Sequence, residues 1–136
     1  MLLNFLTRKE KLKFLDLALH VVSVDGRPSE IEQRLLNMLL AEVGDEIVKE
    51  YQFSLSKSRD ETLNYFIKAS QPVRNIVYLN LLHTTMWDDL YNTLEHFLLE
   101  EIREKFEISE QKKKQLMRLV YNERDLRERA KRVVFH

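Results

Sequence analysis

Residues 18–39 read ALHVVSVDGRPSEIEQRLLNML: an apolar segment, a Gly-Pro break and a second, Leu-rich segment. A shift of 63 residues lays this stretch on residues 81–102, LLHTTMWDDLYNTLEHFLLEEI, with six identities in 22 positions. The identities include Asp25 with Asp88 and Glu32 with Glu95. Similarity at a fixed offset indicates a repeated supersecondary unit. The sequence therefore predicts two similar helical hairpins packed about a pseudo-twofold axis.

The composition favours an all-α fold. Among 136 residues there are only 2 Gly and 2 Pro, whereas Leu occurs 23 times and charged residues make up 32%. Leu, Lys, Arg and Glu are good helix formers, and the shortage of Gly and Pro argues against turn-rich β-folds. No segment alternates apolar and polar residues over a sustained stretch, so we expect no sheet. We expect one domain over residues 1–136, with seven to eight helices around a Leu-rich core.

Capping signals and helix breakers set the expected helix boundaries. Thr7 with Glu10, and Ser29 with Glu32, have the spacing of a capping box, and Gly44 is a helix stop. Helices are expected over 8–23, 29–43, 46–53, 58–70, 72–86, 92–106, from 109 onward, and over 123–134. The domain core should then span 8–122 and be followed by a separate basic helix at 123–134. We expect the second and sixth helices to be central, because their apolar stripes match: Ile31, Leu35, Leu39 and Val43 with Leu94, Leu98, Ile102 and Phe106.

The hairpin motif resembles a known family. A helix ending in Ala-Leu-His-Val-Val-Ser-Val-Asp-Gly, followed by Glu32 and a Leu-rich helix, resembles the TerB-like (tellurite-resistance) family. The resemblance covers about residues 8–122 and is most specific from Val24 to Glu32. It implies a small, non-catalytic, all-helical module in a stress-response or signalling context, with metal ligands at the acidic turns. The second copy departs from the motif, since Asp89 stands where the first copy has Gly26.

Four carboxylates form the candidate metal site: Asp25, Glu32, Asp88 and Glu95. Converging carboxylates suit a hard divalent cation such as Ca²⁺, Mg²⁺ or Mn²⁺. The alternative is that these acids only cap helices. Glu32 and Glu95 occupy the position in a capping box that binds the helix N-terminus without metal, and acids there also suit the helix dipole. In that case the chain is a protein-interaction domain that binds no metal.

The remaining patterns do not indicate an enzyme. His20 and His83 occupy equivalent repeat positions and read as packing residues, and His96 with Glu100 has a zinc-like spacing but no third ligand. The chain lacks a Gly-rich phosphate loop, a Gly-x-Ser-x-Gly elbow and a His-Glu-x-x-His motif. We therefore expect no catalytic residues and no certain cofactor.

Charge is balanced overall but uneven along the chain. The formal net charge is zero, yet residues 110–136 carry +5 and residues 1–109 carry −5. Neutrality argues against a dedicated nucleic-acid-binding protein, and an accessory role of the basic tail on nucleic acid is the weaker alternative. We expect a protein partner, a homodimer being one option. The tail helix should pack on the domain through Leu126, Ala130, Val133 and Val134.

No apolar run is long enough to span a membrane, no secretory signal is recognised at the start, and cysteine is absent. A cytoplasmic location is the simplest expectation from these observations.

Overall fold

The computed structural model describes residues 1–24, 26, 29–53, 58–86 and 93–136, and within these ranges every regular element is helical. The all-α prediction is thereby confirmed for the described part of the chain. A 3₁₀ turn, η1, opens the chain at Leu3–Phe5. The α-helices are α1 (Arg8–Val22), α2 (Glu30–Val43), α3 (Asp45–Glu50), α4 (Arg59–Ile67), α5 (Gln71–Thr85), α6 (Thr93–Lys105) and α7 (Glu110–Phe135).

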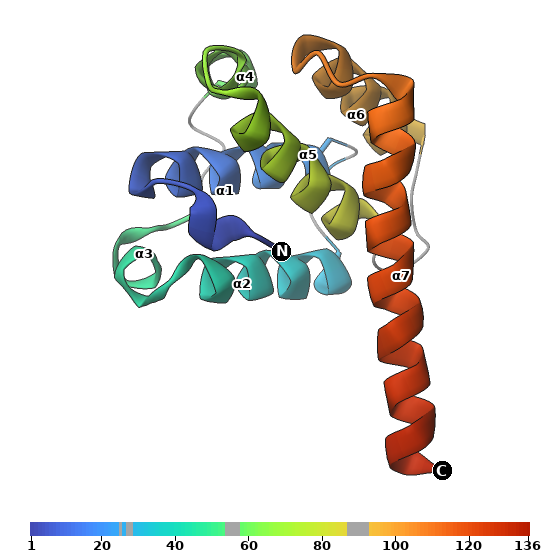
Figure 1. Cartoon of the computed structure of the whole chain (residues 1–136). Helices are drawn as coiled ribbons and strands as arrows, with labels where there is room; N and C mark the ends of the chain where they lie inside the picture. Colours follow the sequence, from blue (N-terminus) through green and yellow to red (C-terminus); the bar gives the residue numbers. More distant parts are fainter. Residues whose placement is uncertain (25, 27–28, 54–57, 87–92) are drawn as a thin grey trace.

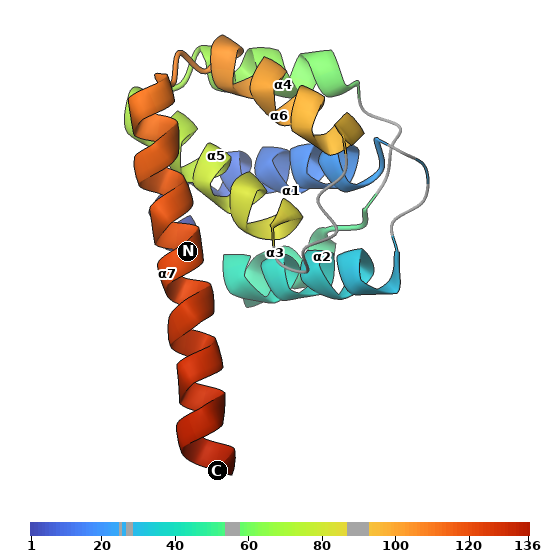
Figure 2. The same ribbon diagram turned by 90° about the vertical axis from the view of Figure 1, so that its right-hand side faces the viewer.

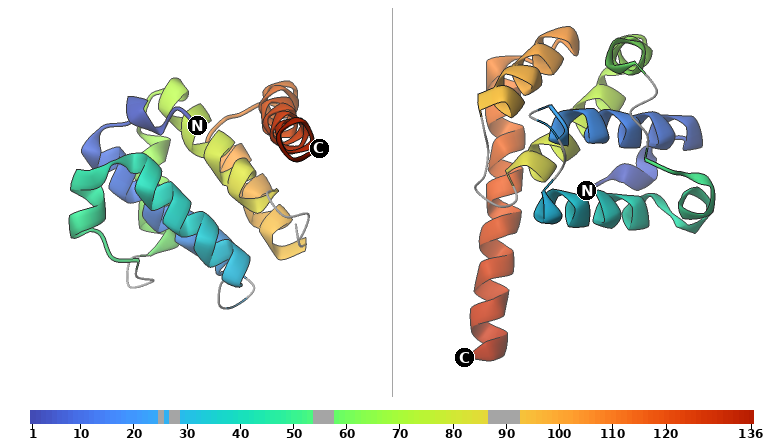
Figure 3. Two further views of the ribbon diagram at one scale, coloured as in Figure 1. Left: turned by 90° about the horizontal axis from the view of Figure 1, so that it is seen from below. Right: turned by 180° about the vertical axis from the view of Figure 1, so that it is seen from behind.

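The helices form three layers with α7 along one side. Helices α1 and α5 make the middle layer, with α2 and α3 on one face and α4 and α6 on the other (Figure 2). Helix α7 packs against α5, and its C-terminal half continues past α2 and away from the other helices (Figures 1 and 3). The two ends of α7 therefore lie in different surroundings, one against the domain and one beyond it.

The centre of the core differs from the expectation. Helices α1 and α5 are central, since Phe14, Leu15, Val77 and Tyr78 are fully buried among their neighbours. The prediction that α2 and α6 are central was wrong. Their stripes begin at exposed residues, Ile31 and Leu94, and cover the core from one side only. The physical reason is that a helix apolar around most of its circumference is buried, whereas a one-sided stripe forms an outer layer.

Capping signals placed the starts of α1, α2, α4 and α7 and the end of α2 correctly, whereas α3 ends at Glu50 and not at 53, and α4 ends at Ile67 and not at 70. Thr7 with Glu10 and Ser29 with Glu32 both form complete capping boxes, and Ser58 and Ser109 accept hydrogen bonds from the third residue of their helices. Gly44 ends α2 with φ at +118°, a conformation that L side chains rarely adopt. Asn92, expected to cap α6, lies outside the described residues.

The expected boundary near residue 123 does not exist. Helix α7 runs without interruption from Glu110 to Phe135, so the basic segment 123–134 is its second half and not a separate helix. The stretch from Tyr121 to Leu126 contains no Gly or Pro that could stop a helix, and charged side chains tolerate the helical conformation well.

Element bounds and burial repeat at the 63-residue offset seen in the sequence. Helix α5 begins and ends 63 residues after α1, and α6 begins 63 residues after α2. The C-cap residues have almost the same dihedrals: Ser23 has φ −100° and ψ 4°, and Met86 has φ −99° and ψ 6°. The buried residues of α1 (14–19, 21 and 22) recur in α5 as 77–82, 84 and 85. Those of α2 (35, 36, 39 and 43) recur as 98, 99, 102 and 106.

Candidate functional site

Of the four predicted metal-site carboxylates, Asp25 and Asp88 lie outside the described residues. Glu32 is engaged locally. Its Oε1 accepts a hydrogen bond from the Ser29 backbone N–H at 3.0 Å, and the Ser29 hydroxyl oxygen accepts from the Glu32 N–H at 3.1 Å. One Glu32 oxygen is therefore committed to the helix N-terminus.

Glu95 differs from Glu32 in its surroundings. Its side chain is buried in the first turn of α6, although a buried carboxylate is costly unless polar groups compensate it. Among the residues that the structure describes, no three His, Asp or Glu side chains come together in a way that could hold a metal ion. The described part of the chain thus brings Glu32 and Glu95 to helix starts and not to a shared cluster.

In the zinc-like pair His96 and Glu100, both carboxylate oxygens of Glu100 are bound by cationic side chains. Glu100 accepts hydrogen bonds from Arg103 Nε at 3.0 Å and from the Lys113 ammonium group. These two cations hold the pKa of Glu100 below its usual value against the opposing effect of burial. Arg103 also pairs with Glu110 at 3.0 Å, so this network ties the end of α6 to the start of α7. The His96 ring lies against Phe97.

A polar cluster joins Met1, which precedes η1, to α2, α5 and α7. The Met1 amine contacts Glu42, and it donates to Asn80 Oδ1 at 2.9 Å. Beside it, His83 Nε2 lies 3.2 Å from Glu123 Oε2. Burial lowers the pKa of His83, and the Glu123 carboxylate opposes that effect only in part. This cluster positions the middle of α7 on α5, and nothing in the sequence pattern pointed to it.

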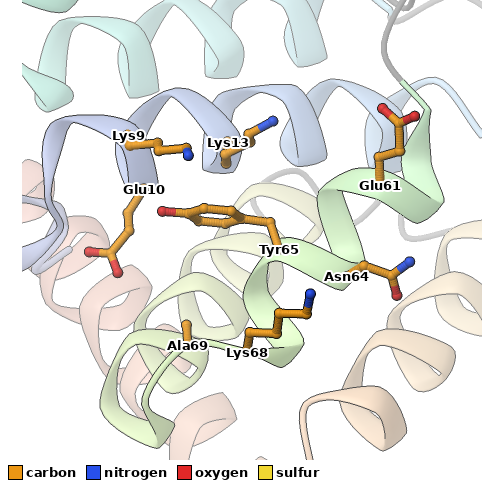
Figure 4. A pocket seen from close by; sticks show the side chains of 8 residues that line it. All are labelled: Lys9, Glu10, Lys13, Glu61, Asn64, Tyr65, Lys68 and Ala69. Carbon is orange, nitrogen blue, oxygen red and sulfur yellow. The ribbon is translucent and has the colours of Figure 1, made fainter.

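An open pocket of about 540 Å³ lies between α1 and α4. Tyr65 forms its floor, and the Lys9 and Lys13 ammonium groups lie 5.4 and 5.8 Å from the ring centroid (Figure 4). Lys68, Glu10 and Glu61 surround it, so three positive and two negative side chains line the opening. Burial, with a smaller effect of Glu10, raises the pKa of the Tyr65 hydroxyl. No nucleophile with an adjacent base lines this pocket, and the mixed charges select no ligand class.

The second half of α7 has an exposed surface that carries several apolar side chains. Leu126 is 63% exposed and Val133 is 82% exposed, and Ala130 and Val134 are exposed as well. The prediction that these residues dock the tail on the domain was therefore wrong. Buried residues occur only in the first half of α7, at Leu116 and Val120, and the C-terminal half extends away from the other helices (Figure 3). We define residues 119–135, of which only Val120 is buried, as the α7 arm.

The α7 arm carries a regular apolar row. Leu119, Leu126 and Val133 are spaced by seven residues, which is two helical turns, and all three are exposed. The row was present in the sequence, but a helix boundary placed at residue 123 divides it in two. The row can be recognised only when α7 is known to be one continuous helix.

None of the described helices is both long enough and apolar enough to cross a membrane. Comparison of the chain with protein-family models, with curated proteins and with solved structures found no match.

Proposed function

We propose that the chain is a non-catalytic protein-interaction module of the TerB-like kind, and that the α7 arm is its contact surface. The observation that carries this proposal is the exposed apolar row on a helix whose first half is anchored in the domain. Leu119, Leu126 and Val133 recur on one face of the helix, and such a recurrence favours an interaction surface, whereas singly scattered apolar residues need no explanation. The chemistry that fits a seven-residue row is a second helix with its own apolar stripe.

The TerB-like assignment rests on the hairpin motif and is supported by the repeat at 63 residues. The matching bounds and burial of α1 with α5, and of α2 with α6, favour two hairpins related by a pseudo-twofold axis. The two hairpins account for α1, α2, α5 and α6, and α7 has no counterpart among these helices. In this proposal α7 is the addition that gives the duplicated core a binding arm.

Site-specific photocrosslinking tests the proposal. A photoreactive residue at position 126 is compared with one at position 37, which is exposed on α2 outside the arm. We expect polypeptide adducts at position 126 only, identified by mass spectrometry and reproduced with the purified partner. Adducts at neither position, or equally at both, would overturn the proposal that the arm is the contact surface.

A divalent-cation module is the second candidate, and the burial of Glu95 is the observation that favours it. A carboxylate taken out of water at a helix start gains from a nearby cation. In this proposal the ligands are Asp25 with Glu32 and Asp88 with Glu95. Titration of chelated protein with Ca²⁺, Mg²⁺ and Mn²⁺ in a calorimeter decides it, because the absence of saturable heat with all three ions would reject it.

A further inference from the structure

We propose that the partner of the α7 arm is a second copy of the same chain, paired antiparallel about a twofold axis at Leu126. This inference deepens the proposed function and rests on it. Two features of the arm carry it: the spacing of its exposed apolar residues and the order of its charges.

The apolar row is symmetric about Leu126. Leu119 lies seven residues before it and Val133 seven residues after it, so all three face the same way along the helix. In an antiparallel pair centred there, Leu126 meets Leu126 of the partner subunit, and Leu119 meets Val133 of the partner subunit. Ala130, four residues from the centre, is small enough to let the two helices approach closely.

The charges beside the row are complementary to themselves in this register. Asp125 and Arg129 lie on one flank of the row, and both are exposed. In antiparallel helices the same flanks meet, so Asp125 is placed beside Arg129 of the partner subunit, and Arg129 beside Asp125 of the partner subunit. Opposite charges at flanking positions set the orientation and register of paired helices. A parallel pair brings together different flanks and loses both contacts.

The charges on the other flank of the row are arranged in the same way. Glu123 lies there with Arg127, and the two already pair within the helix at 3.8 Å. In the antiparallel pair each of them also approaches its opposite on the partner subunit. Like charges also meet in this register: across the axis Asp125 faces Asp125 of the partner subunit and Arg127 faces Arg127 of the partner subunit, and toward the ends Arg118 faces Arg132 of the partner subunit. The short row and this repulsion together predict a weak, reversible dimer.

The place of the arm also suits a second copy. The C-terminal part of the arm extends clear of α2 (Figures 1 and 3). Antiparallel pairing at Leu126 puts the two domains at opposite ends of the pair, each beside the arm of the other. A lipid surface favours a uniformly basic polar face, whereas Glu123 and Asp125 lie beside the row here.

Sedimentation velocity across a concentration series tests the pairing. The wild-type chain should shift from monomer to dimer as its concentration rises from about 1 µM toward about 1 mM, the weak end of the affinity scale. Leu126→Glu places two carboxylates at the axis and should weaken the dimer by about tenfold or more. Phe135→Glu is the matched control, because Phe135 is equally apolar, is exposed and lies on the opposite side of the helix. It should dimerise like the wild type.

Exchange of the flanking charges tests the register. Asp125→Arg and Arg129→Asp should each weaken self-association, because each homodimer then contains two like-charge contacts between positions 125 and 129. An equimolar mixture of the two variants should recover dimers of wild-type affinity, since the contacts between these two positions are again between opposite charges. Native mass spectrometry distinguishes the heterodimer from the homodimers by mass when one variant is isotope-labelled.

Three results would overturn the inference. The wild type stays monomeric throughout the series; Leu126→Glu and Phe135→Glu weaken the dimer equally; or the mixed variants associate no better than each alone. A monomer that binds vesicles of anionic phospholipid through the arm also overturns it, in favour of a lipid surface. If the chain is monomeric and crosslinking at position 126 still captures another polypeptide, the proposed function stands and only the identity of the partner changes.

Discussion

The His83 imidazole on α5 and the Glu123 carboxylate on α7 meet with their Nε2 and Oε2 atoms 3.2 Å apart. The Met1 amine, Glu42 on α2 and Arg127 on α7 also act on this imidazole. The contact joins α7 to α5, so the protonation state of one residue is linked to the docking of the helix that carries the arm.

The stability of the fold should therefore depend on the protonation of His83. Burial lowers the pKa of His83 in the folded state, so below the ordinary histidine pKa of about 6.5 the unfolded chain binds more protons. Stability contributed by the neutral imidazole is present above that pH and is lost as the pH falls toward the folded-state pKa. The loss is at most about 1.4 kcal/mol per pH unit for one proton.

Urea unfolding at intervals from pH 7.5 to 5 measures this effect, with His83→Gln as the reference. The variant should show a flatter dependence than the wild type over the interval. Glu123→Gln should make the loss steeper, because removal of the carboxylate lets the pKa of His83 fall further. Identical slopes in wild type and His83→Gln would show that other groups control the acid sensitivity.

A second prediction concerns Glu107, which follows α6 with φ at +56°. The Ile108 N–H donates to the Arg103 carbonyl at 3.1 Å, so Glu107 holds the left-handed position of a helix C-cap where Gly is usual. An L side chain in this conformation costs about 1–2 kcal/mol. Replacement by Gly removes that cost, but part of the gain is lost because Gly has greater conformational freedom in the unfolded state. Glu107→Gly should raise the free energy of unfolding by about 0.5–1 kcal/mol, and chemical denaturation measures it. Glu104→Gly, within α6, should lower it.

Local chemistry explains which parts of the fold could be predicted from the sequence. Helix starts depend on a hydroxyl and a carboxylate three residues apart, and Ser29 with Glu32 formed the predicted capping box. Because these interactions join residues only three positions apart, they can be recognised from the sequence. The burial of α1 could also have been found, since the segment around Leu15 and Ala18 is apolar on nearly every side. The matching apolar stripes of α2 and α6 instead predicted, wrongly, that these two outer helices are central.

The exposure of the α7 arm could not be predicted from any local pattern in the sequence. Whether Leu126 is covered depends on the direction in which α7 leaves α5, and contacts far apart in the sequence set that direction: His83 with Glu123 and Glu100 with Lys113. The charge asymmetry of the tail was visible, but the exposure of its apolar row was not. Asp25 and Asp88 lie outside the described residues, so the acidic-turn hypothesis stays a prediction.

The two halves of α7 should respond differently to the same substitution. Leu116 is buried against the domain, whereas Leu126 is 63% exposed. Leu116→Ala should cost about 2–3 kcal/mol of unfolding free energy, as expected for a leucine at the edge of a core. Leu126→Ala should change it by less than about 0.5 kcal/mol when the chain is monomeric. Thermal unfolding of dilute protein compares them, and a large loss for Leu126→Ala would mean that the arm folds back on the domain.

A fourth prediction concerns a buried carboxylate in the core. The Tyr51 hydroxyl donates a hydrogen bond to Oδ1 of Asp16, which is almost fully buried, and burial together with this carboxylate raises the pKa of Tyr51. Tyr51→Phe removes a partner of a buried charge and should cost about 1–3 kcal/mol. At the 63-residue offset the equivalent of Asp16 is Leu79, so the core tolerates an apolar residue there. In a double-mutant cycle, Asp16→Leu with Tyr51→Phe should therefore cost less than the two single changes added together.

The last prediction separates the two proposed roles of Glu32. If the carboxylate acts as a cap, Glu32→Gln should preserve stability to within about 0.5 kcal/mol, because Gln also completes a capping box. Glu32→Ala removes the hydrogen bond to the Ser29 N–H and should lower the free energy of unfolding by about 0.5–1.5 kcal/mol. A cap works equally well with chelator present, so we expect Ca²⁺, Mg²⁺ and Mn²⁺ to leave the unfolding temperature of all three proteins unchanged. A cation-dependent rise in the wild type that is lost in Glu32→Gln, and in Asp25→Asn as the matched change across the turn, would instead establish the acidic turn as a metal site, since only the charged oxygens bind a divalent cation strongly while either side chain can cap the helix.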